Sequence, residues 1–343
     1  MNFRSDNEAP AHPRLLEALV AANAGTATAY AEDDWSLALD TAFSERFGRE
    51  CRVLPLATGT AANSITLAAM TPPWGTVLCH RRAHIANDEG GAPMFYMHGA
   101  TLTLLDGSDG RLQPEPLAAA IDAAGAHGVH NLKPAAVSIT QASECGTCYR
   151  PDQVRALAEV AHARGLALHM DGARFANAVA WLACEPAALT WQAGVDALSF
   201  GATKNGAMAA EAIVVFGHPE WLEPLERMRK RGGHLLSKMR YVSAQLLAML
   251  EDDLWLTLAR DANAAAARLA AAIEASPVAS LYWPVEANEV FMQAPPARLA
   301  ELHAAGFAFH IWPGHDGLAR LVCSYATADA DVDRLADAIA QWT

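Results

Sequence analysis

Residues 195–206 read Val-Asp-Ala-Leu-Ser-Phe-Gly-Ala-Thr-Lys-Asn-Gly, a short apolar segment that runs into a turn of small residues. The turn carries one lysine, Lys204, between Gly201 and Gly206. A lysine held in a partly desolvated turn can lose its proton and form an imine with a carbonyl group. The alternative is an ordinary solvated loop lysine. The rest of the chain has to decide between the two.

Length and composition limit the number of domains, the class of partner and the cellular compartment. The 343 residues are enough for one large domain and a smaller one. The net charge of −13 argues against nucleic acid and anionic membrane as partners, and a charged fraction of only 18% favours buried subunit interfaces. We expect neither a signal peptide nor a membrane helix, because no long apolar run is present. Six scattered cysteines are typical of reduced thiols, so we expect a cytoplasmic protein.

Strand-like and helical segments alternate through the first two-thirds of the chain. Strands are predicted over 51–57, 76–80, 101–105, 135–141, 166–170, 195–200 and 212–216, and helices over 14–22, 36–47, 61–70, 114–123 and 151–164. This alternation predicts a mostly parallel sheet covered by helices on both faces. Functional groups in such sheets gather at the strand ends and their loops.

The last third has a different pattern. Helices are predicted over 235–250, 258–275 and 296–305 and from Asp329 onward, with strands over 280–283, 289–293, 307–312 and 319–325. This pattern predicts a smaller α/β domain. We therefore expect an N-terminal arm and helix over 1–25 that pack on the functional site, a large domain over 26–242, and a small domain over 243–343.

Polar groups follow several of the predicted strands. The turn with Gly59 and Thr60 joins a strand to a helix, and its backbone N–H groups form a ready anion site. Asp171 comes directly after a strand, Arg174 follows three residues later, and His84 follows another strand. Each has an ordinary structural explanation, such as a helix cap or a core histidine. Together with Lys204, however, they are the groups that pyridoxal phosphate requires: an amine, a carboxylate for the pyridine nitrogen and a phosphate site.

A metal site is the alternative for the histidines and cysteines. His80 and His84 are four residues apart, and Cys145-Gly-Thr-Cys148 has C-x-x-C spacing. Neither pair has the further ligands that a zinc site needs. We expect no metal, and a metal hydrolase ranks last among the alternatives.

Motifs along most of the chain match one family. They are Arg4-Ser-Asp6, Tyr30 before an acidic pair, Ala57–Asn63, Ala83-His-Ile85, Glu89-Gly-Gly91, Leu168-His-Met-Asp-Gly-Ala-Arg174, Ser199–Gly206, Gly233–Gln245 and Arg320-Leu-Val. The sequence resembles the low-specificity L-threonine aldolases, which are pyridoxal-phosphate enzymes of the aspartate-aminotransferase fold (fold type I). The His-Met-Asp-Gly-Ala-Arg run combined with the lysine turn is the most specific part of the match.

The resemblance implies roles toward the cofactor. Lys204 would form the imine, Asp171 would pair with the pyridine nitrogen, and Arg174 would donate to the phenolic oxygen. Gly59 and Thr60 would hold the phosphate. His84 would stack on the cofactor ring. Arg240 and Lys230 would reach the cofactor phosphate of a neighbouring subunit. The basic run at 227–231, by itself a solvated helix face, would then belong to a shared site.

The resemblance also implies a substrate and a reaction. Ser5 and Arg320 would bind the substrate carboxylate, Tyr30 would line the substrate site, and His84 or His130 would act as the base. The reaction would cleave L-threonine, L-allo-threonine and related amino acids, such as L-phenylserine, to glycine and an aldehyde. The implied assembly is a homotetramer with active sites at dimer interfaces.

Departures from the family pattern and alternative functions stay open. Residues 140–147 read Thr-Gln-Ala-Ser-Glu-Cys-Gly-Thr where many members have Glu-Asn-Thr-His, which affects the expected side-chain preference. Ala31 stands where glycine is common. A β-eliminating lyase or an aminotransferase would use the same scaffold and cofactor, and a binding protein would use the scaffold without turnover.

Overall fold

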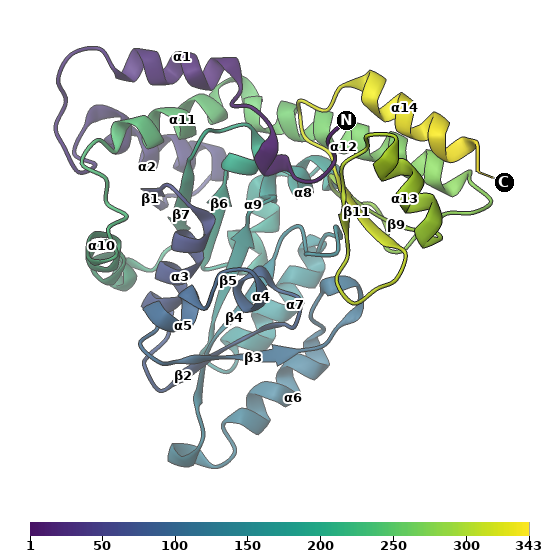
Figure 1. Ribbon diagram of the computed structural model, residues 1–343. Helices are drawn as coiled ribbons and strands as arrows, with labels where there is room; N and C mark the ends of the chain where they lie inside the picture. Colours follow the sequence, from purple (N-terminus) through teal and green to yellow (C-terminus); the bar gives the residue numbers. More distant parts are fainter. Residues whose placement is uncertain (343) are drawn as a thin grey trace.

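The computed structural model describes residues 1–342, and a seven-stranded sheet lies at its centre (Figure 1). Its strands are β1 (Arg52–Leu56), β2 (Gly75–His80), β3 (Thr101–Leu105), β4 (Lys133–Thr140), β5 (Ala167–Gly172), β6 (Ala197–Gly201) and β7 (Glu211–Val215). The strand order is β1-β7-β6-β5-β4-β2-β3. Only β7 runs antiparallel to its neighbours β1 and β6, so the prediction of a mostly parallel sheet is confirmed.

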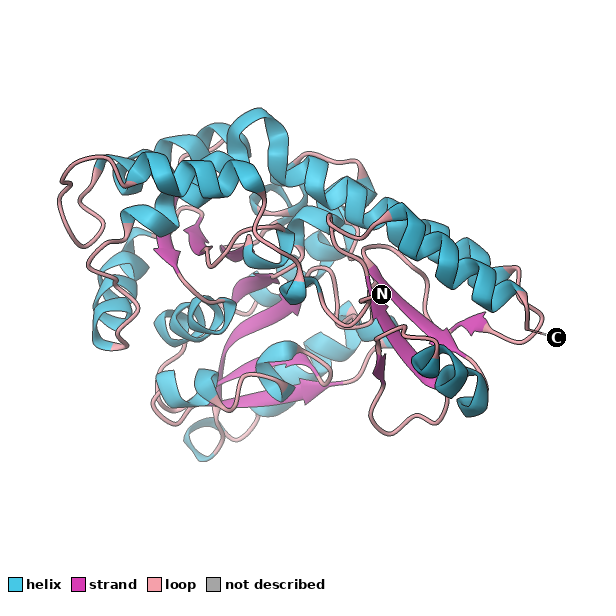
Figure 2. Cartoon of the chain, turned by 45° about the horizontal axis from the view of Figure 1, so that its top comes forward, coloured by secondary structure: helices cyan, strands magenta, loops and turns pink. Residues whose placement is uncertain are grey.

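Helices cover both faces of this sheet (Figure 2). They are α1 (Pro13–Ala22), α2 (Asp34–Phe47), α3 (Gly59–Met70), α4 (His84–Asn87), α5 (Ala92–Tyr96), α6 (Pro114–Ala124), α7 (Pro151–His162), α8 (Phe175–Leu182), α9 (Pro186–Leu189), α10 (Leu222–Arg231), α11 (Arg240–Leu250) and α12 (Leu254–Glu274). Strand side chains alternate between the faces. Val214 joins the core with α2, α7 and α8, whereas Ile213 and Val215 pack with α3 and α10.

Two helical segments differ from the sequence prediction. Helix α8 was not predicted, because Phe175–Val179 are buried all round and show no amphipathic period. The helix predicted from residue 235 begins only at Arg240. Gly233 follows the end of α10 and adopts a φ of +79°, so the chain turns away before α11 starts.

A smaller antiparallel sheet, β10-β11-β9-β8, forms the centre of the C-terminal part. Its strands are β8 (Ser280–Leu281), β9 (Glu289–Gln293), β10 (His310–Ile311) and β11 (Leu318–Val322), flanked by α13 (Pro296–Ala304) and α14 (Asp329–Ala340). The expected boundary at 242/243 falls inside α11, which packs in the large core. The change of core lies within α12: Ala259 belongs to the first core and Ala265 to the second. Helix α12 therefore joins the two parts rigidly.

The N-terminal arm runs between the two parts (Figure 1). Phe3 is buried in the core of the small domain, and its N–H donates to the Ala308 carbonyl at 2.8 Å. Farther along, the His12 N–H donates to the carbonyl of Gly206 in the lysine turn, also at 2.8 Å. The arm thus connects the small domain with the turn that carries Lys204. Within residues 1–342, no helix has the length and apolar character needed to cross a membrane.

Candidate active site

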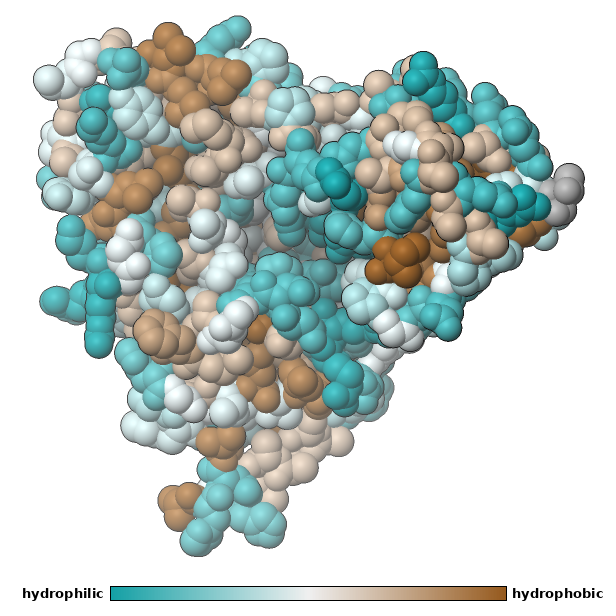
Figure 3. All heavy atoms as spheres, in the orientation of Figure 1, coloured by the Kyte–Doolittle hydropathy of each residue, from teal (hydrophilic) through white to brown (hydrophobic). Residues whose placement is uncertain are grey.

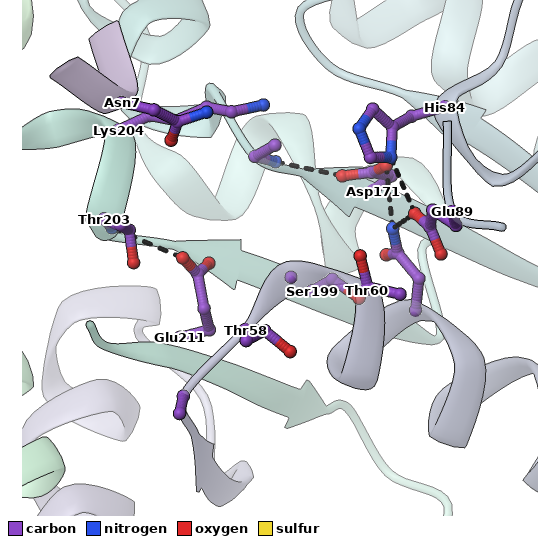
Figure 4. Close-up of a pocket in the computed structure, with 14 residues that line it drawn as sticks. Asn7, Thr58, Thr60, His84, Glu89, Asp171, Ser199, Thr203, Lys204 and Glu211 are labelled. Atoms are coloured by element: carbon purple, nitrogen blue, oxygen red, sulfur yellow. Dashed lines mark hydrogen bonds and ion pairs between the residues drawn. The ribbon is translucent and has the colours of Figure 1, made fainter. Parts of the chain in front are cut away.

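A cavity of about 290 Å³ lies where β5, β6 and β7 meet the N-terminus of α3 (Figure 4). Its lining residues are Asn7, Ala57, Thr58, Gly59, Thr60, Asn63, His84, Glu89, Asp171, Ala173, Ser199, Thr203, Lys204 and Glu211. Five residues that the sequence singled out are therefore brought together here: Gly59, Thr60, His84, Asp171 and Lys204. We call this space the inner cavity.

A larger cavity of about 730 Å³ adjoins it, and we call this the outer cavity. Ser5, Arg174 and Arg320 line it, and it shares Asn7, His84 and Lys204 with the inner cavity. Hydrophilic residues gather along this border between the large and the small domain (Figure 3). Lys204 thus stands between two spaces, one on the sheet side and one on the small-domain side.

The lysine turn is held by its neighbours. Lys204 lies in a short 3₁₀ turn, Thr203–Asn205, in which the Asn205 side chain donates to the Trp255 carbonyl at 2.8 Å. Gly201 has no room for a side chain, because a Cβ there would lie 2.7 Å from the Ala173 backbone. Gly206 has a φ of +102°, which a residue with a side chain rarely adopts. The two glycines that frame Lys204 in the sequence are therefore required by packing and by backbone geometry.

Asp171 ends β5 with its side chain in the inner cavity and is 3% exposed. One carboxylate oxygen accepts the Ala173 N–H at 3.1 Å, and the other accepts the Asn63 side-chain amide at 2.9 Å. These neutral donors orient the carboxylate without supplying a counter-charge. A buried carboxylate so placed can hold a protonated ring nitrogen.

His84 is joined to a buried glutamate. Its Nδ1 lies 2.8 Å from Oε1 of Glu89, and the same oxygen accepts the second N–H of the Asn63 amide at 2.8 Å. The hydrogen bond from Glu89 raises the pKa of His84, and burial raises the pKa of Glu89. Because Nδ1 is engaged, Nε2 is the ring atom left for a ligand. His84, Glu89 and Asp171 also place three ligand-type atoms within 4.8 Å of one another.

The turn before α3, where the sequence predicted an anion site, lies at a helix N-terminus. Thr58 caps the helix by accepting the Ala61 N–H at 3.2 Å, and its carbonyl accepts the Ala62 N–H. The N–H groups of Gly59 and Thr60 precede these and have no partner within the helix. They also lie at the positive end of the helix dipole.

The inner cavity fits pyridoxal phosphate on the evidence of its own side chains. It offers an amine, a buried carboxylate and two N–H groups at a helix N-terminus within one small space. Two buried polar atoms, Oδ1 of Asn63 and Oε2 of Glu89, have no hydrogen-bond partner in the protein. Unpaired buried polar atoms are costly, so they indicate a site that is completed by a polar ligand.

Arg174, which the resemblance assigned to the phenolic oxygen of the cofactor, lines the outer cavity together with Lys204 and is 6% exposed. Its Nε and Nη2 donate to the two oxygens of Asp6 at 2.8 and 3.1 Å, and Nη1 lies 3.2 Å from Glu289. Burial lowers the pKa of Arg174, but the two carboxylates outweigh burial and raise it. The guanidinium is therefore committed to the N-terminal arm and to β9.

Arg320 and Ser5 both line the outer cavity. Arg320 lies on β11 with its guanidinium 5.7 Å from the Trp312 ring centre, and its Nε has no hydrogen-bond partner among the described residues. Ser5 precedes the short turn Asp6–Glu8, where its hydroxyl accepts the Asn7 N–H at 3.2 Å. This pair can bind a carboxylate.

His130 is not brought to either cavity of its own chain. It lies exposed in the short turn Gly128–His130, which precedes β4. Asp171, near the C-terminal end of β5, and Lys204, after the C-terminal end of β6, lie in contrast at the opposite edge of the sheet. A side chain before a parallel strand and one after it lie a full strand length apart. Within one chain, His84 is therefore the candidate base.

Tyr30, Lys230 and Arg240 also lie outside both cavities. The Lys230 ammonium sits 4.1 Å from the centre of the Tyr30 ring, and both side chains are exposed. Arg240 donates to the hydroxyl of its neighbour Tyr241 at 3.3 Å. Ala31 has a φ of +68°, a left-handed conformation that accounts for glycine being common there.

The histidine and cysteine pairs that were weighed as a metal site have different partners. His80 bonds to the Gly107 carbonyl at 3.2 Å, whereas His84 bonds to Glu89. Cys148 is buried beside Glu286, with its thiol 3.1 Å from the Glu286 carbonyl. The histidine pair and the cysteine pair therefore form no common site among the described residues.

Asn63, Glu89 and Glu211 line the inner cavity but had no predicted role. Asn63 and Glu89 lie inside motifs that were recognised, but no role was given to them. Glu211 was missed entirely, although it is the only charged residue in the apolar stretch 207–216. A buried strand that contains one acid is a signal that could have been followed.

Comparison with known proteins identifies the fold and the family. The fold is that of fold type I pyridoxal-phosphate enzymes: an Escherichia coli protein with methionine aminotransferase function shares it at 13% identity (TM-score 0.72, covering 97% of this chain and 91% of that one). A threonine aldolase of Leishmania major aligns with a TM-score of 0.92 at 26% identity, covering 98% of both chains.

A family model described as beta-eliminating lyase matches residues 2–295, and the chain belongs to that family. A low-specificity L-threonine aldolase of Pseudomonas aeruginosa is 41% identical over 97% of this chain and 94% of its own length. A second, from another Pseudomonas species, is 40% identical over 97% and 95%.

Proposed function

We propose that this chain is a pyridoxal-phosphate-dependent carbon–carbon lyase, an L-threonine aldolase. It cleaves L-threonine, L-allo-threonine and related β-hydroxy-α-amino acids to glycine and an aldehyde. The observation that carries the proposal is the position of Lys204 between an inner cavity that fits the cofactor and an outer cavity with an unpaired arginine. The similarity to named L-threonine aldolases supports it.

Three groups of the inner cavity would hold the cofactor. Lys204 would supply the amine for its carbonyl group, the Asp171 carboxylate would face its ring nitrogen, and the N–H groups of Gly59 and Thr60 would face its phosphate. When bound, pyridoxal phosphate supplies an electron sink for the pair of electrons released as the Cα–Cβ bond of the substrate breaks. Asp171 maintains that capacity because it is buried, where its charge is weakly screened.

The outer cavity orients the amino acid. Arg320 and the Ser5 hydroxyl bind the substrate carboxylate, which places the side chain toward His84. Nε2 of His84 then accepts the proton of the β-hydroxyl group, and Glu89 stabilises the resulting imidazolium through Nδ1. Asp6 and Glu289 neutralise Arg174, which leaves it little capacity for a substrate carboxylate, whereas the Nε of Arg320 is unpaired among the described residues.

Replacing Arg320 with alanine should raise KM for L-threonine by about 10- to 100-fold, the range of one or two lost charge-assisted hydrogen bonds. Cofactor content should stay unchanged, because Arg320 does not line the inner cavity. Steady-state kinetics and cofactor absorbance measure both quantities. Arg81→Ala, at an exposed arginine of the same cavity, is the control. Loss of cofactor from the Arg320 variant would contradict the assignment.

The pH dependence of kcat/KM should report His84. Neutral His84 is the active form, so the rate rises with pH, and the acid limb should lie above the ordinary value of 6.5 because Glu89 raises the pKa of His84. Glu89→Gln removes that influence, and the limb should move to lower pH. Asp88→Asn removes an exposed charge nearby and should shift the limb less. An unmoved limb in Glu89→Gln would rule out His84 as the titrating base.

We also propose a homotetrameric assembly with sites shared between subunits, in the cytoplasm. Tyr30, Leu236 and Lys230 form an exposed group beside Arg240, and the backbone of Tyr30 bonds to Ser237. Such a surface can place cations near the phosphate of a neighbouring subunit. His130 can likewise act as a base only in the site of a neighbouring subunit. The six free cysteines support a reducing compartment. Light scattering of the purified chain measures the assembly directly.

The second candidate is a β-eliminating lyase, because the matching family carries that description. The two reactions release different products from the same bound amino acid. Incubating the purified chain with L-threonine and L-phenylserine and measuring glycine and aldehyde against ammonia and keto acid separates them. Glycine formed in equal amount with the aldehyde supports the aldolase. The same assay detects an aminotransferase when a keto acid acceptor is added.

A further inference from the structure

We infer that Glu211 is a proton-carrying partner of the cofactor phosphate, so that cofactor binding is coupled to the protonation of this side chain. The inference rests on the proposed function in one respect, namely that the turn at Gly59 and Thr60 binds the phosphate. Glu211 has no role in the proposed function. Its carboxyl group lies where a negative charge would repel the phosphate group of the cofactor.

The side chain of Glu211 lies close to the turn at Gly59 and Thr60, which we call the phosphate turn. Glu211 begins β7, between β1 and β6, where its backbone pairs with Leu56 and Gly201. Its side chain is 7% exposed and lines the inner cavity. Oε1 accepts the Thr203 N–H at 3.4 Å, and Oε2 lies 3.9 Å from the point where a Cβ on Gly59 would stand. Figure 4 shows the carboxyl group between Thr203 and Thr58.

The charges around Glu211 come from two elements. Lys204, on the lysine turn, favours the ionised form, and Asp171, on β5, opposes it. Helix α3 contributes only the uncharged Thr58, Gly59 and Thr60 at this point, while His84 and Glu89 line the far side of the cavity.

One further cation is buried on this face of the sheet. Arg229 of α10 donates to the Pro55 carbonyl of β1 at 3.4 Å. No second cation is seen in contact with Glu211 among residues 1–342 of this chain. A phosphate that bound beside an ionised Glu211 would therefore meet an unscreened negative charge.

A neutral carboxyl group removes that conflict. When protonated, the group donates one O–H hydrogen bond, and phosphate oxygens are strong acceptors. Burial is the largest influence on this acid and raises the pKa of Glu211 to about 7, although the Thr203 hydrogen bond and Lys204 lower it. A nearby phosphate favours the proton further. Binding above neutral pH then requires proton uptake, and affinity falls by up to about tenfold per pH unit.

The test compares the full-length chain with its Glu211→Gln variant. Cofactor is removed by dialysis, and pyridoxal phosphate is titrated back at pH 6.5, 7.5 and 8.5, with Kd measured by equilibrium dialysis. Glutamine keeps the size and a hydrogen-bond donor but cannot ionise. Glu115→Gln, at an exposed residue of α6, removes one charge elsewhere and is the matched control. Pyridoxal, which lacks the phosphate, is titrated in parallel.

Between pH 6.5 and 8.5, the ratio of the wild-type Kd to the Glu211→Gln Kd for pyridoxal phosphate should rise at least tenfold. Glu115→Gln should follow the wild type, and pyridoxal should show no such difference. Because both chains are titrated with the same compound, the effect of the cofactor's own ionisation on Kd is the same for both and cancels in the ratio. A second measurement needs no variant: calorimetry in two buffers of different ionisation enthalpy should show more proton uptake at pH 8 with pyridoxal phosphate than with pyridoxal.

Three results would overturn the inference. The first is the same pH dependence in Glu211→Gln and wild type. The second is weaker binding by the variant at every pH, which would mean that ionised Glu211 pairs with a cation of another subunit. The third is an equal effect with pyridoxal, which would place the action of Glu211 at Lys204. A wild-type chain that binds no pyridoxal phosphate at any pH would instead refute the proposed function.

Discussion

Replacing Lys204 with alanine is expected to lower the rate of L-threonine cleavage by on the order of 10⁵-fold or more, as loss of a covalent nucleophile does elsewhere. Among residues 1–342, Lys204 is the only amine that lines the inner cavity. The chain has four lysines, and Lys133, Lys230 and Lys238 are exposed outside it. No other lysine of the same chain can therefore take over its role.

The site of attachment can be measured apart from activity. Borohydride reduction of the wild-type chain with bound cofactor should fix the cofactor to the peptide that contains Lys204, as seen by mass spectrometry. The Lys204→Ala variant should carry no fixed cofactor, and Lys133→Ala should behave as wild type. Cofactor fixed to Lys133, Lys230 or Lys238 instead would refute the assignment of the site.

Replacing His84 with alanine should lower kcat for L-threonine by about 10²–10⁴-fold, the usual contribution of a positioned general base. The imidazole lines both cavities beside Lys204, and Glu89 fixes its orientation through a 2.8 Å contact at Nδ1. Cofactor binding should weaken much less, because Lys204, Asp171 and the phosphate turn remain. Single-turnover kinetics and cofactor absorbance separate the two effects.

His130 provides the comparison. It lies exposed at the opposite edge of the sheet, so His130→Ala should lose less than about tenfold in rate. A large loss in His130→Ala would show that a neighbouring subunit brings this histidine to the site. Small losses in both variants would mean that water or another group of the cavity accepts the hydroxyl proton.

Local patterns were sufficient for most secondary structure. The strands at 101–105 and 289–293 were predicted to the residue, because each is a short run of β-formers between turn signals. Where local pattern and structure disagree, the cause is tertiary. Helix α8 contains one polar residue, Asn177, so no polar face reveals its period, and the start of α11 is delayed by the backbone turn at Gly233.

In the candidate site too, local sequence could identify some groups and not others. The amine, the carboxylate and the anion turn could be identified from sequence because each directly follows a strand, and the C-terminal ends of strands share one edge of a sheet. The pairing of Arg174 with Asp6 could not be foreseen. It joins residues 168 positions apart, and the N-terminal arm that carries Asp6 is placed by bonds to the small domain.

The sequence by itself therefore determined the class of fold, the lysine and the chemistry of its neighbours, because these depend on residue types at fixed distances from strand ends. Only the tertiary structure decided which charges meet. It joined Arg174 to Asp6 and left Arg320 with an unpaired Nε, it set His84 against Glu89, and it turned Glu211 toward the phosphate turn. Burial and pairing between distant segments set the charge of a buried group, and neither can be read from local sequence.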